Sequence, residues 1–493
     1  MGIVQRQSFW NLTFTILGVL LGYVNKLYFY SEWLEKSEFG LIELLLAVMI
    51  IGSEFSMLGV GKVITRFFPY FRGRGKKEGQ FVSFVASYGL LGFLGLSLFL
   101  LIFKPVVVVQ FGENSPLFVE HYLYLIPLCL AYAAYRVLQG ISQALLKSVV
   151  PIFAFHFALR LFQSGIIIIY FVGGLNFIGL LNAFVWGYYL PAGIILAYLI
   201  WLKKFEFSWS LAMWRSRVGR LLLLYGGFVA LSETSMVLLG RIDAVMVGKI
   251  LGEIQVGPYA IAIYIATLVA IPARSISNIV MPLLGIHVKN RDWKKVAQLY
   301  QKNAMFNLLL GTLLLIGIWV NIDPYFVLSP KHIAGRDAAL IIGIGFWFGI
   351  AAGPNRQIIM MSRHFRFDLY LNLILVVIAI IGNLLLIPEY GLVGAALATS
   401  VTLSLYNICG VSFLWIKMKL FPYTAKTIVA LLSGGLVLFI GLYMPAPDSP
   451  LFEMLTRSIV VTVIFGGIVL GLRLLPDVND MLRHHWKKWV LRR

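Results

Sequence analysis

Apolar runs of about 20 residues recur along the whole chain and are separated by short polar or basic segments. A run of this length forms a helix that can cross a hydrocarbon core of about 30 Å. We interpret the run after Met1–Trp10 as the first span and not as a signal peptide, because it is long and lacks a small-residue cleavage site. The pattern predicts an all-α integral membrane protein with about fourteen spans, at roughly 9–30, 39–60, 81–103, 117–140, 151–172, 177–202, 221–248, 257–285, 303–320, 337–361, 368–388, 391–416, 427–444 and 453–475.

Charge is sparse and unevenly placed. Of 493 residues, 60% are hydrophobic and 13% are charged, whereas a soluble domain carries about 25% charge. With a cytoplasmic N-terminus, 29 of the 41 Lys and Arg fall in cytoplasmic segments, five in outer loops and seven within spans. This bias follows the positive-inside rule and predicts that both termini of the chain lie in the cytoplasm. It explains the net charge of +20 without nucleic acid, and the basic face would attract anionic membrane lipids.

Three landmarks recur at offsets of 213 to 217 residues, which indicates an internal duplication. The matching pairs are Gly40 and Gly257, Pro69 and Pro282, and Gly179 and Gly394. Because each half holds six spans, an even number, the two bundles share one orientation and form a parallel repeat. The expected organisation is a first bundle at 1–203, a cytoplasmic linker at 204–220, a second bundle at 221–420, two further transmembrane helices at 421–475 and a basic cytoplasmic tail at 476–493.

Catalytic motifs are missing from the sequence. It contains no HExxH, no GxSxG and no glycine-rich phosphate loop, and its seven histidines are scattered. The two cysteines, Cys129 and Cys409, lie within apolar runs, where neither a metal site nor a disulfide framework is expected. We therefore predict a transport protein without a cofactor or a metal, and not an enzyme.

Charged residues inside the predicted spans are the candidate site residues, because a charge in lipid costs several kcal/mol unless it faces protein or water. Arg160 and Glu233 fall near the middle of spans 5 and 7 and indicate a water-filled interior, with a structural ion pair as the alternative. Lys26 and Arg241 lie nearer the outer ends, where snorkelling competes with function. Asp243 occupies the repeat position of Lys26, so a pair between the two is a further hypothesis.

Two other embedded charges point to gating. Arg274 follows Pro272 by two residues, and a proline inside a helix frees a carbonyl and allows a bend. A bend beside a charge is a plausible gate, and core packing with Arg274 snorkelling inward is the alternative. Glu54 lies in the inner half of span 2, just before a basic loop.

Three segments resemble the polysaccharide-transporter branch of the multidrug/oligosaccharidyl-lipid/polysaccharide (MOP) flippase superfamily, which contains the Wzx-type O-antigen and capsule-repeat flippases. They are RIDAVMVGKILGEIQVGPYAIAIYIATLVAIPARSISNIVMP, SEFGLIELLLAVMIIGSEFSMLGVGKVITRFFPYFRGRGKK and YGLVGAALATSVTLSLYN. The resemblance covers most of residues 8–420. It implies two six-helix bundles around a central cavity, lined by spans 1, 2, 7 and 8, that opens alternately to either side. The resemblance also implies a location in the bacterial cytoplasmic (inner) membrane. The implied substrate is an oligosaccharide on undecaprenyl pyrophosphate, moved to the outer leaflet of that membrane for surface polysaccharide biosynthesis such as that of lipopolysaccharide.

Carried onto this chain, the resemblance gives the embedded charges their expected roles. Arginine pairs with phosphate through two hydrogen bonds at once, so the expected substrate-binding residues are Arg160, Arg274, Arg241 and Lys26. The acids expected to couple ions, H+ or Na+, or to gate are Glu233, Asp243 and Glu54. The family's Asp-Arg order at the end of span 7 is reversed here. Two alternatives stay open: a cation-coupled multidrug antiporter of the same superfamily, and a membrane-embedded polysaccharide polymerase or glycosyltransferase, which the short outer loops disfavour.

Overall fold

A computed structural model describes residues 3–73, 75–202, 208, 212–445, 447, 449–476 and 479–480. Within these ranges, the side chains at 3–5, 8, 212, 272 and 274–279 lie outside the description. The predicted basic tail also lies outside it from residue 481 onward. By packing, the chain divides into two compact units, Met1–Pro258 and Tyr259–Arg493, called unit 1 and unit 2 below.

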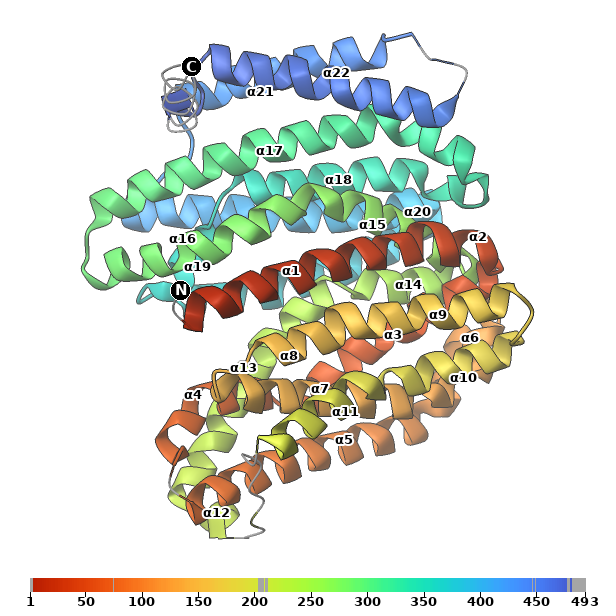
Figure 1. The fold of residues 1–493 in the computed structure, drawn as a ribbon, viewed down its shortest axis with the longest axis vertical. Helices are drawn as coiled ribbons and strands as arrows, with labels where there is room; N and C mark the ends of the chain where they lie inside the picture. The colour runs from red at the N-terminus through yellow and green to blue at the C-terminus, as the bar shows by residue number, and fades with distance from the viewer. Residues whose placement is uncertain are drawn as a thin grey trace, which may run out of the picture. The chain divides into compact units, whose positions relative to one another are not determined.

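Unit 1 consists of long apolar helices interrupted by short breaks (Figure 1). Two of the breaks divide predicted spans: one at Leu58 and Gly59, both in the left-handed region, and one at Gly240 and Arg241. Its elements are α1 (Ile3–Val24), η1 (Asn25–Tyr30), α2 (Ser31–Trp33), α3 (Lys36–Met57), α4 (Val60–Phe71), α5 (Lys76–Phe111), α6 (Pro116–Glu120), η2 (Tyr122–Tyr124), α7 (Leu125–Ala144), α8 (Val149–Ile152), η3 (Phe153–Ala158), α9 (Leu159–Phe171), α10 (Phe177–Gly187), α11 (Tyr189–Trp201), α12 (Ala212–Arg215), α13 (Arg217–Leu239) and α14 (Ile242–Ile250).

Helix α15 (Glu253–Thr267) begins in unit 1 and continues into unit 2. The other elements of unit 2 are η4 (Leu268–Ala270), α16 (Ile271–Lys289), α17 (Trp293–Leu328), η5 (Pro330–Gly335), α18 (Arg336–Ala351), α19 (Asn355–Met361), α20 (Arg366–Met418), α21 (Ala425–Leu442) and α22 (Pro450–Gly471).

The structure contains 13 helices long and apolar enough to cross a membrane among its described residues, against about fourteen predicted spans. The difference arises in α20, which joins two predicted spans over 53 residues. Its backbone turns back at Gly391, where φ is +59°, a conformation that glycine adopts without steric cost. A Cβ added at Gly382 would lie 3.4 Å from the Ala398 Cβ, so the two halves of α20 pack against each other. The predicted all-helical membrane fold is confirmed.

Element lengths match the predicted duplication. Helices α5 and α17 both have 36 residues, and their first residues, Lys76 and Trp293, stand 217 positions apart. The first residues of α3 and α15, Lys36 and Glu253, are separated by the same offset. The predicted domain boundaries stay a prediction, and the division by packing falls at Pro258, later than the predicted linker, because α13 and α14 pack against α3.

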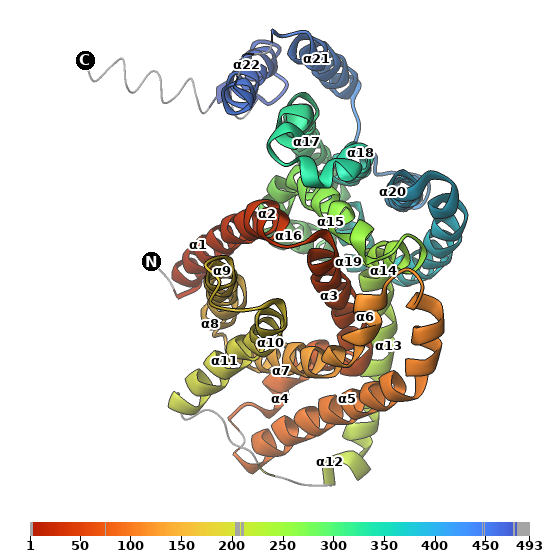
Figure 2. The ribbon, with the colours of Figure 1, turned by 90° about the vertical axis from the view of Figure 1, so that its right-hand side faces the viewer.

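The helices α1, α9, α10, α7 and α3 follow one another around unit 1, each packed on the next (Figure 2). Their outer surfaces carry exposed apolar side chains such as Leu161 and Ile169 on α9. Several charged and amide side chains of these helices and of η1 are instead buried, among them Lys26, Glu43 and Glu54. An apolar exterior with polar groups inside is the reverse of a soluble bundle and is expected for a protein in lipid.

Candidate functional site

Lys26 and Glu43 form an ion pair inside unit 1. Lys26 lies on η1, a π-helical turn that interrupts the first span, and such turns are frequent at functional sites. Glu43 lies on α3, and the exposed fractions of the two side chains are 3% and 6%. The Lys26 ammonium also lies 4.7 Å from the centre of the Tyr30 ring, so an aromatic face adds to its stabilisation.

Arg160 on α9 points toward the first span. A Cβ added at Gly22 would lie 3.6 Å from the Arg160 Nε, so the guanidinium lies beside the backbone of α1. Its Nη1 donates to the Gln163 Oε1 at 3.0 Å. The Asn25 amide donates to the Arg160 carbonyl at 3.0 Å and accepts from the Ser164 hydroxyl at 2.7 Å, which ties η1 to α9. These contacts hold Arg160 next to the segment that carries Lys26.

Arg241 completes a group of three cations that we call the basic cluster: Lys26, Arg160 and Arg241. It stands in the break between α13 and α14, and its side chain is half-buried. Both arginines lie within electrostatic range of the Lys26 ammonium and repel it. Among the described residues, the ion pairs involve neither Arg160 nor Arg241. Arg160 and Arg241 therefore have no carboxylate partner among these residues, and the Arg160 Nη1 is hydrogen-bonded to Gln163.

Two ion pairs form a second group, the four-charge network: Glu54, Arg136, Lys62 and Glu233. Glu54 on α3 lies 3.1 Å from Arg136 on α7, and Lys62 on α4 lies 3.7 Å from Glu233 on α13. The two pairs also lie within electrostatic range of each other, since the Glu233 charge influences both Glu54 and Arg136. The network thus joins four helices of unit 1, and its two acids and two cations balance in charge.

Two tyrosines lie within electrostatic range of these charges. Tyr132 on α7 lies within electrostatic range of both Glu54 and Arg241. Tyr188, between α10 and α11, lies within range of Arg160 and Glu43 and is 4% exposed. Tyr132 is therefore near charges of both groups, whereas Tyr188 is near Arg160 and Glu43.

The other two predicted site residues are less informative. Asp243 is buried in the first turn of α14, where its carboxylate accepts a hydrogen bond from the Ala244 backbone N–H at 2.8 Å. Lys26, its hypothetical partner, is paired with Glu43. The side chain of Arg274 lies outside the described residues, and its backbone belongs to α16.

A set of hydrogen bonds, which we call the clasp, joins the α5–α6 loop and the start of α6 to the end of α14 and the start of α15. The Glu253 carboxylate accepts from the Leu117 and Phe118 backbone N–H groups at 3.1 and 2.8 Å. The Asn114 amide donates to the Lys249 carbonyl at 3.0 Å, and the Ser115 hydroxyl donates to Gly248 at 2.7 Å. The clasp lies at the end of unit 1 that the charge bias predicts to face outward.

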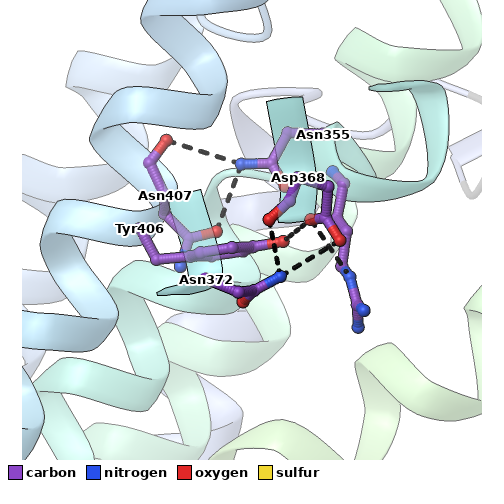
Figure 3. Close-up of polar contacts among 6 residues, drawn as sticks. Asn355, Asp368, Asn372, Tyr406 and Asn407 are labelled. Atoms are coloured by element: carbon purple, nitrogen blue, oxygen red, sulfur yellow. Dashed lines mark hydrogen bonds and ion pairs between the residues drawn. The ribbon is translucent and has the colours of Figure 1, made fainter. Parts of the chain in front are cut away.

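Unit 2 contains a separate polar cluster around Asp368 on α20 (Figure 3). The carboxylate accepts from the Tyr406 hydroxyl at 2.5 Å and from the Asn372 amide at 3.1 Å. Arg356 on α19 pairs with it at 3.4 Å, while the neighbouring Asn355 donates to the Asn407 side chain at 3.2 Å. Every partner comes from the same unit, and together they supply the hydrogen bonds and the opposite charge that the buried Asp368 carboxylate needs. We therefore interpret the cluster as a structural link between α19 and the two halves of α20.

Sequence reasoning named five of the charges in these groups. It missed Glu43, Arg136 and Lys62 as ion-pair partners and Glu253 as the acceptor for the N–H groups of α6. Glu43 was recognisable as an acid inside a span, but its pairing with Lys26 depends on how η1 faces α3. Lys62 lies in a basic segment, where a positive-inside anchor is the ordinary interpretation. Glu253 precedes an apolar run, and nothing in its neighbourhood marks it as a cap for another helix.

No protein-family model matches the chain. A membrane protein of uncharacterised function from Methanocaldococcus jannaschii is 21% identical, over 94% of this chain and 93% of its own length. Among solved structures, the lipid II flippase MurJ in an inward closed conformation superposes with a TM-score of 0.73 at 16% identity, over 94% of this chain and 98% of that one.

Multidrug transporters match as well. A multidrug resistance MATE family transporter of the MOP superfamily, in an inward-facing conformation, has a TM-score of 0.61 at 17% identity, over 84% of this chain and 98% of that one. The MATE multidrug transporter DinF-BH in complex with R6G has a TM-score of 0.54 at 19% identity, over 86% and 98% of the two chains. The chain therefore has the fold of membrane flippases and transporters of the MOP superfamily.

Proposed function

We propose that this protein is an alternating-access flippase that moves an oligosaccharide linked to undecaprenyl pyrophosphate across the cytoplasmic membrane for surface polysaccharide biosynthesis. The observation that carries the proposal is the basic cluster, three cations buried or half-buried in unit 1 of which one has an acid partner. Cations without a paired acid are costly in a membrane interior, which favours a functional role for them. The likeness to the lipid II flippase MurJ supports the same class of substrate, a lipid-linked saccharide.

The basic cluster would bind the pyrophosphate. Arg160 and Arg241 each offer a planar guanidinium that forms paired hydrogen bonds with phosphate oxygens. Lys26 adds a point charge fixed by Glu43 and by the Tyr30 ring. The low dielectric of the surroundings strengthens these attractions relative to water. The sugar would then extend along the polar groups near Tyr132 and Tyr188.

The four-charge network and the clasp would act as the elements that open and close. The Lys62–Glu233 pair is partly exposed, with 54% and 31% of the two side chains accessible, and such pairs contribute about 0 to 1 kcal/mol. It is therefore easily exchanged for other contacts when helices move. Glu54, Glu233 and Asp243 are the acids proposed to bind H+ or Na+ as the coupling ion, Glu54 and Glu233 only after helix movement separates them from Arg136 and Lys62. Opening toward the outside would require the clasp to release.

The main alternative is a cation-coupled multidrug antiporter, which the likeness to MATE transporters supports. A cationic drug needs an acid that is not already neutralised. Glu54 and Glu233 are each paired with a cation in the structure, which favours an anionic substrate over a cationic one. Drug resistance on overexpression that Glu233→Gln abolishes would support the antiporter instead.

The test is leaflet translocation of a fluorescent undecaprenyl-pyrophosphate-linked saccharide in proteoliposomes. Wild-type protein is expected to move the substrate, and Arg160→Ala is expected to slow it by about 10- to 100-fold, since hydrogen bonds to charged groups contribute about 1.5 to 3 kcal/mol. Arg72→Ala, which removes an exposed arginine of unit 1, is the matched control. Absence of movement with several glycans, by protein shown to be folded, would overturn the flippase proposal. Full activity of Arg160→Ala would overturn only the site.

A further inference from the structure

A basic hollow of about 360 Å³ lies at one end of unit 1, away from the basic cluster. Its size falls in the range of about 300 to 1,000 Å³ that is typical of small-ligand sites. Three segments meet around it: the start of α1, the turn between α7 and α8, and the end of α11. The lining residues are Arg6, Gln7, Trp10, Lys147, Val149, Val150 and Tyr198.

Side-chain hydrogen bonds hold the walls of the hollow together. The Gln7 amide donates to the Leu146 carbonyl at 2.9 Å and accepts from the Ser148 hydroxyl at 3.3 Å. The Asn11 amide donates to the same hydroxyl at 2.9 Å, so one face of α1 is fixed against the α7–α8 turn. In the turn itself, the Ser142 hydroxyl donates to the Lys147 carbonyl at 2.6 Å. The position of Lys147 relative to α1 is therefore defined by the fold.

The lining favours an anion. Among the described residues that form it, two are cationic, Arg6 and Lys147, and none is acidic. Arg6 is exposed and Lys147 is half-buried, so both remain free to turn toward a ligand. A guanidinium and an ammonium facing one hollow match the oxygens of a phosphate group.

The surroundings favour a lipid as the source of that phosphate. Trp10 and Tyr198 have the amphipathic rings that gather at the level of lipid headgroups. Next to the hollow, large apolar side chains are exposed: Phe9 at 62%, Leu146 at 67% and Trp201 at 76%. Acyl chains that cover these side chains would place their headgroup phosphate beside Arg6 and Lys147.

We propose that this hollow is a binding site for the phosphate headgroup of an anionic phospholipid from the leaflet that the N-terminal end of α1 faces. Arg6 and Lys147 bind the phosphate, Trp10 and Tyr198 flank the headgroup, and the exposed apolar side chains contact the acyl chains. The lipid bridges the start of α1 and the α7–α8 turn. It is distinct from the transported substrate, since the basic cluster lies on η1, on α9 and between α13 and α14, none of which lines the hollow. The site stands whether or not the proposed function is correct.

Native mass spectrometry of the full chain, purified in detergent and titrated with phosphatidylglycerol, measures this binding directly. Juxtamembrane basic residues contribute about 1 kcal/mol each, which corresponds to about fivefold in affinity per residue. Arg6→Ala combined with Lys147→Ala is therefore expected to weaken the binding of one phosphatidylglycerol by roughly 30-fold. Arg72→Ala combined with Lys77→Ala removes two exposed cations elsewhere in unit 1 and is expected to leave that binding unchanged.

Further arms separate the sources of the phosphate. Phosphatidylcholine is expected to bind equally to wild type and to the Arg6/Lys147 variant, because its headgroup has no net charge. Millimolar inorganic phosphate is expected not to displace phosphatidylglycerol, and Arg6→Lys with Lys147→Arg is expected to retain binding. Equal phosphatidylglycerol affinity in wild type and the Arg6/Lys147 variant would overturn the proposal. So would a loss of phosphatidylglycerol affinity in the Arg72/Lys77 control variant as large as the loss in the Arg6/Lys147 variant. Displacement by inorganic phosphate would make the hollow a free-anion site. If the double variant folds poorly, Arg6→Ala alone is tested, because its side chain is exposed; it is expected to weaken phosphatidylglycerol binding about fivefold.

Discussion

Lys26 on η1 and Glu43 on α3 form an ion pair whose two side chains are 3% and 6% exposed. Removing two charges from water costs several kcal/mol for each ion, and their attraction repays this only when the geometry is good. Such a pair is weak evidence for stability. Arg160 and Arg241 lie within electrostatic range of Lys26, and under the proposed function the pair would hold the Lys26 charge in place for an anionic substrate.

The first prediction separates these two roles of the pair. Lys26→Met leaves Glu43 buried without its cation, so we expect a loss of about 3 to 5 kcal/mol in stability. Lys26→Met combined with Glu43→Met replaces both charges by apolar side chains, and we expect stability within about 1 kcal/mol of wild type. The measurement is the temperature at which Cys129, buried in α7, reacts with a thiol-specific dye.

The same double variant is then assayed for translocation of the pyrophosphate-linked saccharide. A folded but inactive protein is the expected result, since the point charge of Lys26 is gone while the packing is kept. Wild-type transport by the double variant would show that the pair is structural and that Lys26 does not contact the substrate.

The second prediction concerns Gly40, one of the landmarks of the repeat. A Cβ at this position would lie 1.8 Å from the Glu253 carbonyl oxygen, a distance that requires the backbone of α3 or α15 to move. Overpacking of this kind costs about 1 to 3 kcal/mol, so Gly40→Ala is expected to lower the unfolding temperature. At Gly61, by contrast, no atom lies within 4 Å of an added Cβ, and Gly61→Ala is expected to be neutral or stabilising by up to about 1 kcal/mol. Equal stability of the two variants would contradict the close approach of α3 and α15.

The third prediction tests the clasp. Glu253→Gln removes the negative charge that accepts from the Leu117 and Phe118 N–H groups. Hydrogen bonds to charged groups contribute about 1.5 to 3 kcal/mol, so the amides of α6 are expected to exchange roughly 10- to 100-fold faster with deuterium. Glu113→Gln changes an exposed acid of the same loop and should leave exchange unaltered. Unchanged protection of α6 in Glu253→Gln would mean that the carboxylate does not hold the loop.

Much of the fold follows from the hydrophobic pattern, because a long apolar run has few options in lipid besides a helix. The spans and the repeat were predictable for this reason, and the equal lengths of α5 and α17 agree with the predicted offset. The position of the break at Gly240 and Arg241 was not predicted. The apolar run continues through this break, so hydrophobicity alone does not indicate it. A glycine directly before a charged residue is only a weak sign of a break.

The embedded charges were also predictable, but their pairing was not. A charge inside a span is conspicuous, since it is costly in lipid, and this identified Lys26, Arg160 and Glu233. Which acid meets which cation depends on helix rotation and on the π-helical turn at η1, neither of which a single sequence determines. Glu43 paired with Lys26 and Lys62 paired with Glu233 are examples.

The last prediction concerns Asp368, the acid at the centre of the polar cluster in unit 2. Its carboxylate accepts hydrogen bonds from Tyr406 and Asn372 and pairs with Arg356. Asp368→Ala leaves the half-buried Arg356 guanidinium and the half-buried Tyr406 hydroxyl without their acceptor, so we expect a loss of about 1 to 3 kcal/mol. Glu389→Gln alters an exposed acid on the same helix and is expected to change stability by no more than about 0.5 kcal/mol.

The two native cysteines report which part of the chain the change at Asp368 affects. Cys409 is half-buried on α20, three residues after Tyr406, and Cys129 is buried in unit 1. If the cluster ties α19 to the two halves of α20, Asp368→Ala should make Cys409 react with a thiol-specific dye at a lower temperature than in wild type, and Cys129 should change less. Equal shifts at both cysteines would mean that the chain unfolds as one cooperative body, and no shift at Cys409 would show that the cluster does not hold α20 together.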